Sequence, residues 1–345
     1  MSNTHVDTPG ARAFEIFDAA EPAVARLIAL YEEAIAFLNR RFRAVIDGAP
    51  FEGRIRAFYP ELRITIDTHA RLDSRLAFGY VQAPGVYATT VTRPDLFAHY
   101  LGVQIGQLLA NHGVGVEVGW SSQPIPLHFA LRSDTALSFD AADRLDRPLR
   151  DVFDVPDLAV TDDAIANGTL KPRAGEPGPL APFTAPRVDY SLHRLAHYTA
   201  TRPEHFQNFV LFTNYQFYVD EFVAYARAAV DDPESDYEAF VEPGNVVWTR
   251  GADEASEGVA PPRLPQMPAY HLTRAGHSGI TMVNIGVGPS NAKTITDHVA
   301  VLRPHAWVML GHCAGLRNSQ KLGDYVLAHA YVRDDHVLDA DLPLW

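Results

Sequence analysis

The amino-acid sequence predicts an α+β domain followed by an α/β domain with a three-layer, mostly parallel sheet. Two patterns lead to this prediction. In residues 1–160, amphipathic helical segments alternate with short segments of strand character, which is typical of an α+β domain. In residues 187–345, continuous apolar runs precede segments with helical spacing, as expected for parallel strands that are covered on both faces.

A segment rich in proline and glycine separates the two patterns. Residues 161–186 contain five prolines and three glycines, and this composition disfavours regular structure. We therefore predict an interdomain linker, or a loop lying on the surface, at residues 161–186. It divides the chain into an α+β domain over residues 1–160 and an α/β domain over residues 187–345.

The elements of both domains are predicted from apolar periodicity. A helix at residues 18–43 has Pro22 in its first turn, and Gly48 and Pro50 follow its end. The other elements predicted for the first domain are a helix at residues 94–111 and strands at residues 62–66, 78–82, 86–91, 114–118 and 127–131. Those of the second domain are strands at residues 209–213, 280–286, 306–311 and 325–332 and helices at residues 216–230 and 290–302.

The bulk composition excludes several classes of function. With 47% hydrophobic and 21% charged residues, the chain has the composition of a soluble globular protein. A formal net charge of −13 argues against binding nucleic acid or an anionic membrane surface. The single cysteine allows no internal disulfide, and no signal peptide or apolar run of about eighteen residues occurs. We expect a cytoplasmic protein.

Ligands of open α/β sheets bind at the carboxyl ends of the strands. Three such ends are predicted, at residues 213–215, 286–290 and 311–315, and the latter two are rich in small residues. Small residues let a ligand approach the backbone closely. Candidate binding residues at these ends are Asn214, Gly286, Gly288, Ser290, His312, Cys313 and Ala314.

The glycine segment at residues 286–290 does not fit the two best-known glycine motifs. A dinucleotide-binding fingerprint needs glycine where Asn291 stands, and a P-loop needs glycines at Val287 and Ala292. What is left is a strand, a glycine turn and a helix start with Ser290 as its predicted cap. Such a helix start favours an anion or a sugar hydroxyl. A tight turn without a ligand is the alternative.

The segment at residues 311–315 also has simpler interpretations. His312 can be a hydrogen-bonded loop histidine. Cys313 is more typical of a buried small hydrophobe than of a nucleophile, since no general base lies near it in the sequence. No spacing of histidine, cysteine and carboxylate residues predicts a metal site.

Several segments of the second domain resemble the AMP nucleosidase family. They lie at residues 197–216, 240–245, 264–271, 282–293 and 303–318. The resemblance is close over residues 187–345, and residues 1–160 are compatible with the amino-terminal regulatory domain of that family. It implies hydrolysis of AMP to adenine and ribose 5-phosphate by a domain of the nucleoside phosphorylase superfamily.

The resemblance also implies roles for individual residues. Gly286 and Gly288 match the glycine loop beside ribose and phosphate, and His312, Cys313 and Ala314 match the loop that lies against ribose and base. His197 matches a histidine that reaches the active site of a neighbouring subunit near the ribose 5′ position. The implied assembly is a homo-oligomer, a hexamer, with shared active sites. No cofactor is implied for the reaction, and MgATP is implied as an allosteric activator acting through the first domain.

The cations that hold the 5′-phosphate are left open by the sequence. Lys293, Arg317 and Lys321 lie near the predicted ligand loops, but each can equally belong to a solvated helix face.

Departures from the superfamily pattern favour hydrolysis over phosphorolysis. Tyr218 and Met309 stand where phosphorylases place phosphate-binding arginines, and His312 replaces a serine. Without those arginines the charge-assisted contacts that orient phosphate are lost, so water is the expected nucleophile. The alternatives are a nucleoside phosphorylase or another purine nucleosidase of the same fold, or a truncated nucleotide-binding protein without catalytic activity.

The catalytic groups of the superfamily do not appear in the sequence. The acid that hydrogen-bonds the purine and a ribose-binding methionine–glutamate pair are expected beyond Trp345, so the chain is expected to be truncated at its carboxyl terminus.

We predict that the chain Met1–Trp345 by itself releases no adenine from AMP and is poorly soluble. A parallel sheet that stops after four strands has an uncovered edge and exposes apolar faces, at a cost of roughly 25 cal/mol per Å². Adenine release, solubility and limited proteolysis of this chain test the prediction. Robust AMP hydrolysis by a soluble 345-residue protein would contradict it.

Overall fold

The computed structural model describes residues 6–7, 9, 13–69, 79–131 and 147–328. The chain divides into two compact units, Met1–Tyr190 and Ser191–Trp345. Their boundary falls inside helix α6 (Ala185–Thr199). None of the helices in the described ranges is both long and apolar enough to span a membrane.

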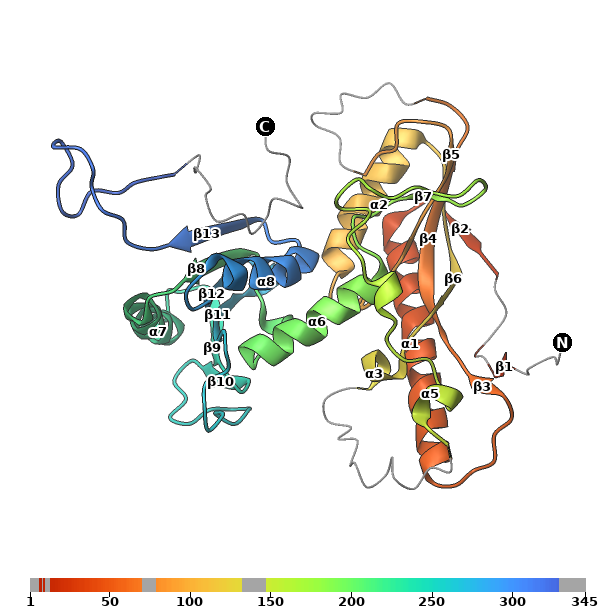
Figure 1. Cartoon of the computed structure of the whole chain (residues 1–345), viewed down its shortest axis with the longest axis horizontal. Helices are drawn as coiled ribbons and strands as arrows, with labels where there is room; N and C mark the ends of the chain where they lie inside the picture. Colours follow the sequence, from red (N-terminus) through yellow and green to blue (C-terminus); the bar gives the residue numbers. More distant parts are fainter. Residues whose placement is uncertain (1–5, 8, 10–12, 70–78, 132–146, 329–345) are drawn as a thin grey trace. The chain divides into compact units, whose positions relative to one another are not determined.

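The first unit packs a long helix against a five-stranded sheet (Figure 1). Helix α1 (Ala20–Ile46) buries one face, on which Leu27, Leu30 and Ala34 recur at helical spacing. The sheet has the order β2-β6-β4-β5-β7 and is antiparallel except for the β5–β7 pair. Its strands are β2 (Glu15–Phe17), β6 (Val116–Pro124), β4 (Phe58–Ile66), β5 (Gly85–Thr90) and β7 (Gly178–Pro179).

Shorter elements complete the first unit. Helix α2 (Ala98–His112) packs on α1 and ends at Gly113, which has a φ of 65° that glycine tolerates at a helix end. The others are β1 (Val6–Asp7), β3 (Arg54–Ile55), α3 (Leu127–Ala130), α5 (Leu149–Val152) and the 3₁₀ turn η1 (Leu158–Val160).

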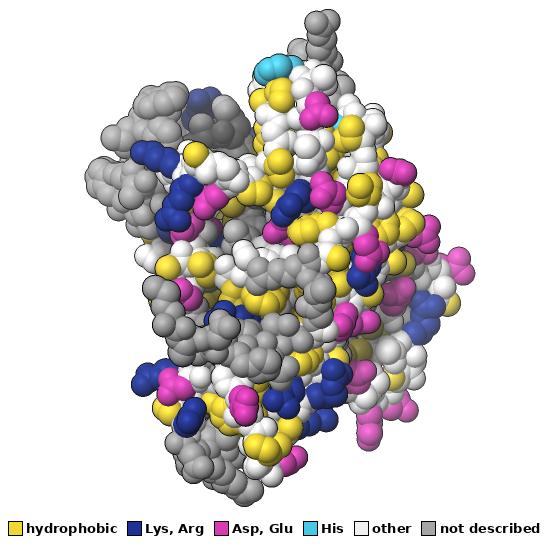
Figure 2. Space-filling model, turned by 90° about the vertical axis from the view of Figure 1, so that its right-hand side faces the viewer, with side chains coloured by type: hydrophobic (Ala, Val, Ile, Leu, Met, Phe, Trp, Pro, Cys, Tyr) yellow, Lys and Arg dark blue, Asp and Glu magenta, His cyan; other side chains and the backbone are white. Residues whose placement is uncertain are grey.

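Acidic and basic side chains lie interspersed on the face of the molecule shown in Figure 2. Among the pairs in this unit are Arg26 with Glu15 and Arg63 with Glu61, each at 2.7 Å.

Most elements of the first unit agree with the sequence prediction, but two do not. The strand predicted at residues 127–131 is the short helix α3, which follows Pro126. Residues 79–82 of the strand predicted at residues 78–82 form no strand, and residue 78 lies outside the described residues. Residues 161–186 are mostly turns, in which β7 pairs with β5 and α6 begins at Ala185.

The second unit has three layers, with α7 (Gln216–Asp231) on one face of a six-stranded sheet and α6 and α8 (Pro289–Val299) on the other (Figure 1). The strand order is β10-β9-β11-β12-β8-β13. The strands are β8 (Phe209–Thr213), β9 (Tyr237–Glu242), β10 (Val246–Thr249), β11 (Ala269–Arg274), β12 (Ile280–Asn284) and β13 (Ala306–Leu310). Three 3₁₀ turns are η2 (Pro203–His205), η3 (Ala275–His277) and η4 (Ala300–Leu302).

Strand β8 shows why its apolar run is continuous. Val210 and Phe212 belong to the core that contains residues of α6 and α8, whereas Leu211 packs against the core that contains residues of α7. Successive side chains of a strand point to opposite faces, so a strand covered on both faces must be apolar throughout.

The sheet is mixed, not mostly parallel. Strand β8 pairs in parallel with β12 and β13, but β12 with β11, β11 with β9 and β9 with β10 are antiparallel. The sequence prediction missed β9, β10 and β11. The part of the strand predicted at residues 325–332 that the structure describes, residues 325–328, forms no strand, and the rest lies outside the described residues.

A buried histidine joins the strands of the second unit to the segment before β8. His271 of β11 is fully buried, and its ring nitrogens lie 2.9 Å from Thr281 Oγ1 and Thr201 Oγ1. Burial, and to a lesser extent the nearby His205, holds the pKa of His271 well below its usual range. The side chain is therefore neutral in the folded unit.

We predict that the second unit loses stability as the pH falls below about 6.5, the pKa of an unfolded histidine. Below that pH the unfolded chain binds a proton that folded His271 does not, so unfolding becomes easier. Urea denaturation between pH 7.5 and 5 measures the free energy of unfolding. In the variant His271→Leu this free energy should be lower throughout and should change less with pH. The control is His305→Leu, a substitution at an exposed histidine. It should keep the slope of unfolding free energy against pH that the unsubstituted protein shows. Equal slopes in all three proteins would contradict the assignment.

Candidate functional site

Three loops meet at one edge of the second sheet because their strands pair in register. Asn284 at the end of β12 and Leu310 at the end of β13 both lie opposite Thr213 at the end of β8. The sequence prediction that these carboxyl ends share an edge is confirmed. The candidate site consists of residues 213–215, 285–290 and 311–315, which we call the three edge loops.

The glycine loop is built around Asn284. Its Oδ1 accepts a hydrogen bond from the Gly286 amide at 3.1 Å, and its Nδ2 donates to Gln216 Oε1 of α7 at 3.3 Å. Gly286 has a φ of 66° and Gly288 a φ of 109°, a region that residues with a Cβ rarely adopt. The two glycines thus let the chain turn sharply from β12 into α8.

The amino-terminal cap of α8 is Gly288, not Ser290. Pro289 takes the first helical position and no side chain caps the helix. Ser290 is exposed in the first turn, and its carbonyl accepts a hydrogen bond from the Thr294 hydroxyl at 2.9 Å. The first amide groups of α8 therefore lack a side-chain cap, and these groups favour an anion or a hydroxyl oxygen.

Aromatic rings from two edge loops and from the first turn of α7 pack together at this edge. The ring of His312 lies 4.5 Å from that of Tyr215 and 5.3 Å from that of Tyr218. The two tyrosine rings lie edge to face at 6.1 Å. We call Tyr215, Tyr218 and His312 the aromatic cluster. Such rings offer flat surfaces and polar tips to a planar ligand.

His312 and Cys313 differ from their simpler interpretations. Within the described part of the chain, His312 makes ring contacts and no hydrogen bond, so the interpretation as a hydrogen-bonded loop histidine is wrong. Cys313 is exposed rather than buried. Residues 311–319, which include Ala314, are all exposed, so this loop is open to a ligand.

Asn214 holds an unpaired polar atom at the same edge. Its Oδ1 is buried and finds no hydrogen-bond partner among the described residues. Leaving a buried acceptor unpaired costs about 1–3 kcal/mol. A ligand hydroxyl or amino group that donated to this oxygen would recover that energy.

The remaining predicted residues have no described contact with the aromatic cluster. Lys293 on α8 forms an ion pair of 3.0 Å with Asp297. Arg317 and Lys321 are exposed in the segment after β13. His197 is exposed on α6, and its ring contacts Tyr198 at 5.4 Å. The described contacts of His197 do not include the edge loops.

The edge loops supply binding groups but no acid. Residues 213–215, 285–290 and 311–315 contain no aspartate or glutamate. Across the described ranges, no cluster of histidine, cysteine and carboxylate side chains is arranged to hold a metal ion.

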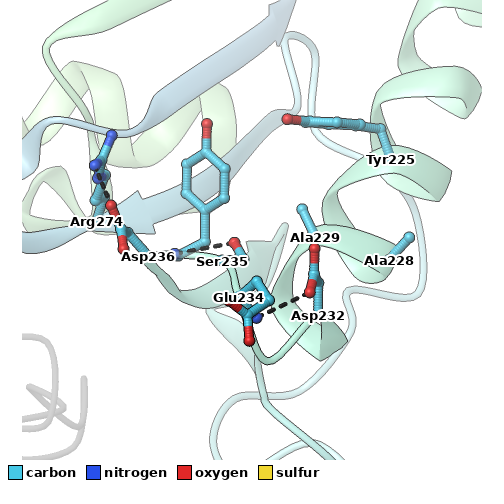
Figure 3. Close-up of a pocket in the computed structure, with 9 residues that line it drawn as sticks. Tyr225, Ala228, Ala229, Asp232, Glu234, Ser235, Asp236 and Arg274 are labelled. Atoms are coloured by element: carbon cyan, nitrogen blue, oxygen red, sulfur yellow. Dashed lines mark hydrogen bonds and ion pairs between the residues drawn. The ribbon is translucent and has the colours of Figure 1, made fainter.

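A second hollow in this unit has the opposite electrostatic character. About 480 Å³ in volume, it is lined by Tyr225 and by Asp232, Glu234 and Asp236, and Arg274 is bonded to Asp236 (Figure 3). It lies at the carboxyl end of α7, and Arg274 pairs with Tyr237 at the other edge of the sheet. Its carboxylates and the negative pole of the helix repel an anion, so a phosphate-bearing ligand is better served by the edge loops.

Sequence analysis missed Asn284 and the role of Tyr215. A signal for Asn284 was present, because an amide side chain follows the apolar Met282 and Val283 at the end of β12. The edge-to-face contact of Tyr215 with His312 had no signal in the sequence, since nearly one hundred residues separate the two.

Comparison with known proteins finds AMP nucleosidases. Residues 22–177 match the family described as the N-terminus of bacterial AMP nucleoside phosphorylase. The chain is 45% identical over 330 residues to the AMP nucleosidases of Escherichia coli (strain K12) and Escherichia coli O157:H7. These alignments cover 93% of this chain and 67% of each relative, so the chain spans about two thirds of their length.

A crystal structure of AMP nucleosidase from Bacteroides thetaiotaomicron VPI-5482 is also similar, at 23% identity and a TM-score of 0.28. That match covers 40% of this chain and 45% of the other.

We predict that substitution of the two asparagines at this edge has different effects on folding stability. The variant Asn284→Leu should lose about 1–3 kcal/mol of folding free energy, because two hydrogen bonds are broken. Asn214→Leu should leave the melting temperature unchanged or raise it, because it removes an acceptor that the folded protein leaves unpaired. Thermal denaturation of both variants measures the difference. Equal destabilisation by the two substitutions would show that Asn214 has a structural partner.

Proposed function

The chain belongs to the AMP nucleosidase family, and on that basis we propose that the protein hydrolyses the N-glycosidic bond of AMP, releasing adenine and ribose 5-phosphate. The observation that carries the proposal is the 45% identity that extends over 93% of the chain. Identity of this extent covers both units, so the proposal does not depend on a single motif.

The edge loops offer groups that suit the three parts of AMP. The rings of the aromatic cluster, of which Tyr215 and His312 are exposed and Tyr218 is half-buried, suit the purine, whose flat faces stack on such rings. The buried Oδ1 of Asn214 can accept a hydrogen bond from a ribose hydroxyl or from the purine amino group. The uncapped start of α8 favours the phosphate or a sugar oxygen. Lys293 and Arg317 are the cations nearest in sequence to these loops.

The aromatic cluster also supports water as the nucleophile. Tyr218 lies in the cluster, and Met309 is half-exposed on β13. Both positions correspond by resemblance to phosphate-binding arginines. A phenol and a thioether carry no positive charge, so neither can hold a phosphate dianion as a guanidinium does. Hydrolysis needs no such cation at the position of the nucleophile.

Cleavage of an N-glycosidic bond passes through a transition state that resembles an oxocarbenium ion. The purine leaves more readily when an acid hydrogen-bonds to its ring, and a carboxylate stabilises the positive sugar. Since the edge loops contain no carboxylate, their contribution is to bind and orient AMP. The acid must come from residues outside these loops.

The finer features of the protein follow from the family and extend the proposal. The first unit acts as a regulatory domain that binds MgATP, and no cofactor is needed for the reaction. The protein is a cytoplasmic hexamer with shared active sites, in which His197 acts across a subunit boundary. The exposure of His197 on α6 supports this role.

We predict that an enzyme containing this chain turns over AMP without inorganic phosphate. The products should be adenine and ribose 5-phosphate, because the positions of the phosphate-binding arginines hold Tyr218 and Met309. Chromatography of the products, in buffers with and without phosphate, is the measurement. A requirement for phosphate, with ribose 1,5-bisphosphate as product, would identify a phosphorylase instead.

Two variants test whether AMP binds at the edge loops, by measurement of the dissociation constant of AMP. Asn214→Leu should weaken AMP binding by roughly 2- to 12-fold, the equivalent of about 0.5–1.5 kcal/mol for one hydrogen bond. Tyr225→Leu, at the opposite edge of the sheet, should leave AMP binding unchanged.

A further inference from the structure

A buried carboxyl group lies where the first unit ends. Asp189 is the last residue but one of that unit and is 3% exposed. Its Oδ2 accepts a hydrogen bond of 2.6 Å from the Tyr59 hydroxyl, and its Oδ1 accepts one of 2.8 Å from the Thr92 hydroxyl. Both donors are neutral. The site thus offers hydrogen bonds to a carboxylate, and no ion pair of Asp189 occurs among the described residues.

The charged groups around Asp189 are paired with other residues. Arg93, next to Thr92, forms three hydrogen bonds with Asp95, at 3.0, 3.3 and 2.9 Å. On the helix of Asp189 itself, Arg187 forms an ion pair of 2.7 Å with Asp163. Neither arginine forms an ion pair with Asp189 in the described contacts.

Besides Arg93, two phenols act on Asp189 among the described residues. Tyr59 comes from β4, and Tyr31 of α1 has its hydroxyl 3.4 Å from Thr92 Oγ1. Burial, with the charge of Asp189, raises the pKa of both tyrosines. Both are neutral across the physiological range, so Asp189 is the group in this cluster that can change its charge.

Burial is the main cause that raises the pKa of Asp189, to about 7. The hydrogen bonds from Tyr59 and Thr92 and the charge of Arg93 oppose this shift without cancelling it. An aspartate released into water has a pKa near 3.9. At a pH between these two values, the buried Asp189 therefore holds a proton that it gives up when it is released into water.

The position of Asp189 gives this proton a structural consequence. Helix α6 begins in the first unit and continues as the first segment of the second. Through Asp189, its first turns are joined to Tyr59 of β4 and to Thr92 after β5. We propose that Asp189 is a proton-controlled clamp, which fastens the first turns of α6 to the first unit when protonated and loosens them when ionised.

The direction of the pH effect follows from linkage. Below about pH 4 both states are protonated, and the clamp has its full strength. Between about pH 4 and pH 7 the released carboxyl ionises while the buried one does not, so the attachment weakens as the pH rises. Above about pH 7 the buried carboxyl is ionised as well, and no further loss occurs. Within the window, release of one proton raises the opening constant by up to tenfold per pH unit.

Hydrogen exchange of α6 tests the clamp in the 345-residue chain. Exchange of peptides that cover residues 185–199 is measured from pH 5 to pH 8 and corrected for the intrinsic rate. The opening constant of the unsubstituted chain should rise across the window and level off above pH 7. In Asp189→Asn it should not rise as the pH rises, because an amide accepts from Tyr59 and donates to Thr92 without ionising. Glu52→Gln, an exposed carboxyl in the same unit, should behave like the unsubstituted chain. Equal pH slopes with and without Asp189 would overturn the proposal.

Carbon-13 NMR of labelled aspartate carboxyls gives a second readout. One carboxyl should titrate near pH 7, and its signal should be absent in Asp189→Asn. If that variant does not fold, Thr92→Val provides the test. It removes a hydroxyl that favours the ionised form of Asp189, so the midpoint of the Asp189 titration should move to higher pH. An Asp189 that titrates below about pH 5 in the folded chain would overturn the proposal.

Discussion

Parallel pairing of β8 with β12 on one side and β13 on the other is the constraint on which the candidate site depends. It places Thr213, Asn284 and Leu310 at one level, and each loop then begins where a strand ends. The same pairing requires both faces of β8 to be covered, so α7 lies on one face and α6 and α8 on the other. The apolar core and the polar site are therefore consequences of the same three strands.

Two titratable groups that this fold buries are hydrogen-bonded only to hydroxyl groups in the described contacts. His271 sits between two threonine hydroxyls and Asp189 between the hydroxyls of Tyr59 and Thr92. In each case burial moves the pKa toward the uncharged form, because a low-dielectric interior penalises charge. The two groups respond to pH in opposite directions, since one is a base and the other an acid. Asn214 differs from both, because its buried oxygen lacks a protein partner within the described residues and belongs to an edge loop, where a ligand can satisfy it.

Electrostatic character distinguishes the two edges of the second sheet. At the carboxyl edge lie the uncapped start of α8 and the aromatic cluster; at the other, the end of α7 lies with three carboxylates and one arginine. A chain with a net charge of −13 repels a nucleotide over most of its surface. The helix start and the absence of aspartate and glutamate from the edge loops reduce that repulsion at this edge.

The sequence by itself determined the elements that local pattern controls. Strands β8 and β13 and helix α7 agree with their predicted bounds to within one residue, since a continuous apolar run or a 3.6-residue period identifies its own structure. The three edge loops and their glycines followed from the same pattern. Tertiary structure decided what depends on distant partners. Strands β9 and β11 have weak local patterns and form because each pairs with a neighbour. The aromatic cluster, the pairing of Asn284 with Gln216 and the burial of Asp189 likewise join side chains that are remote in the chain. Periodicity reports which face of an element is buried, whereas the identity of the residue that covers it is fixed only when the chain packs.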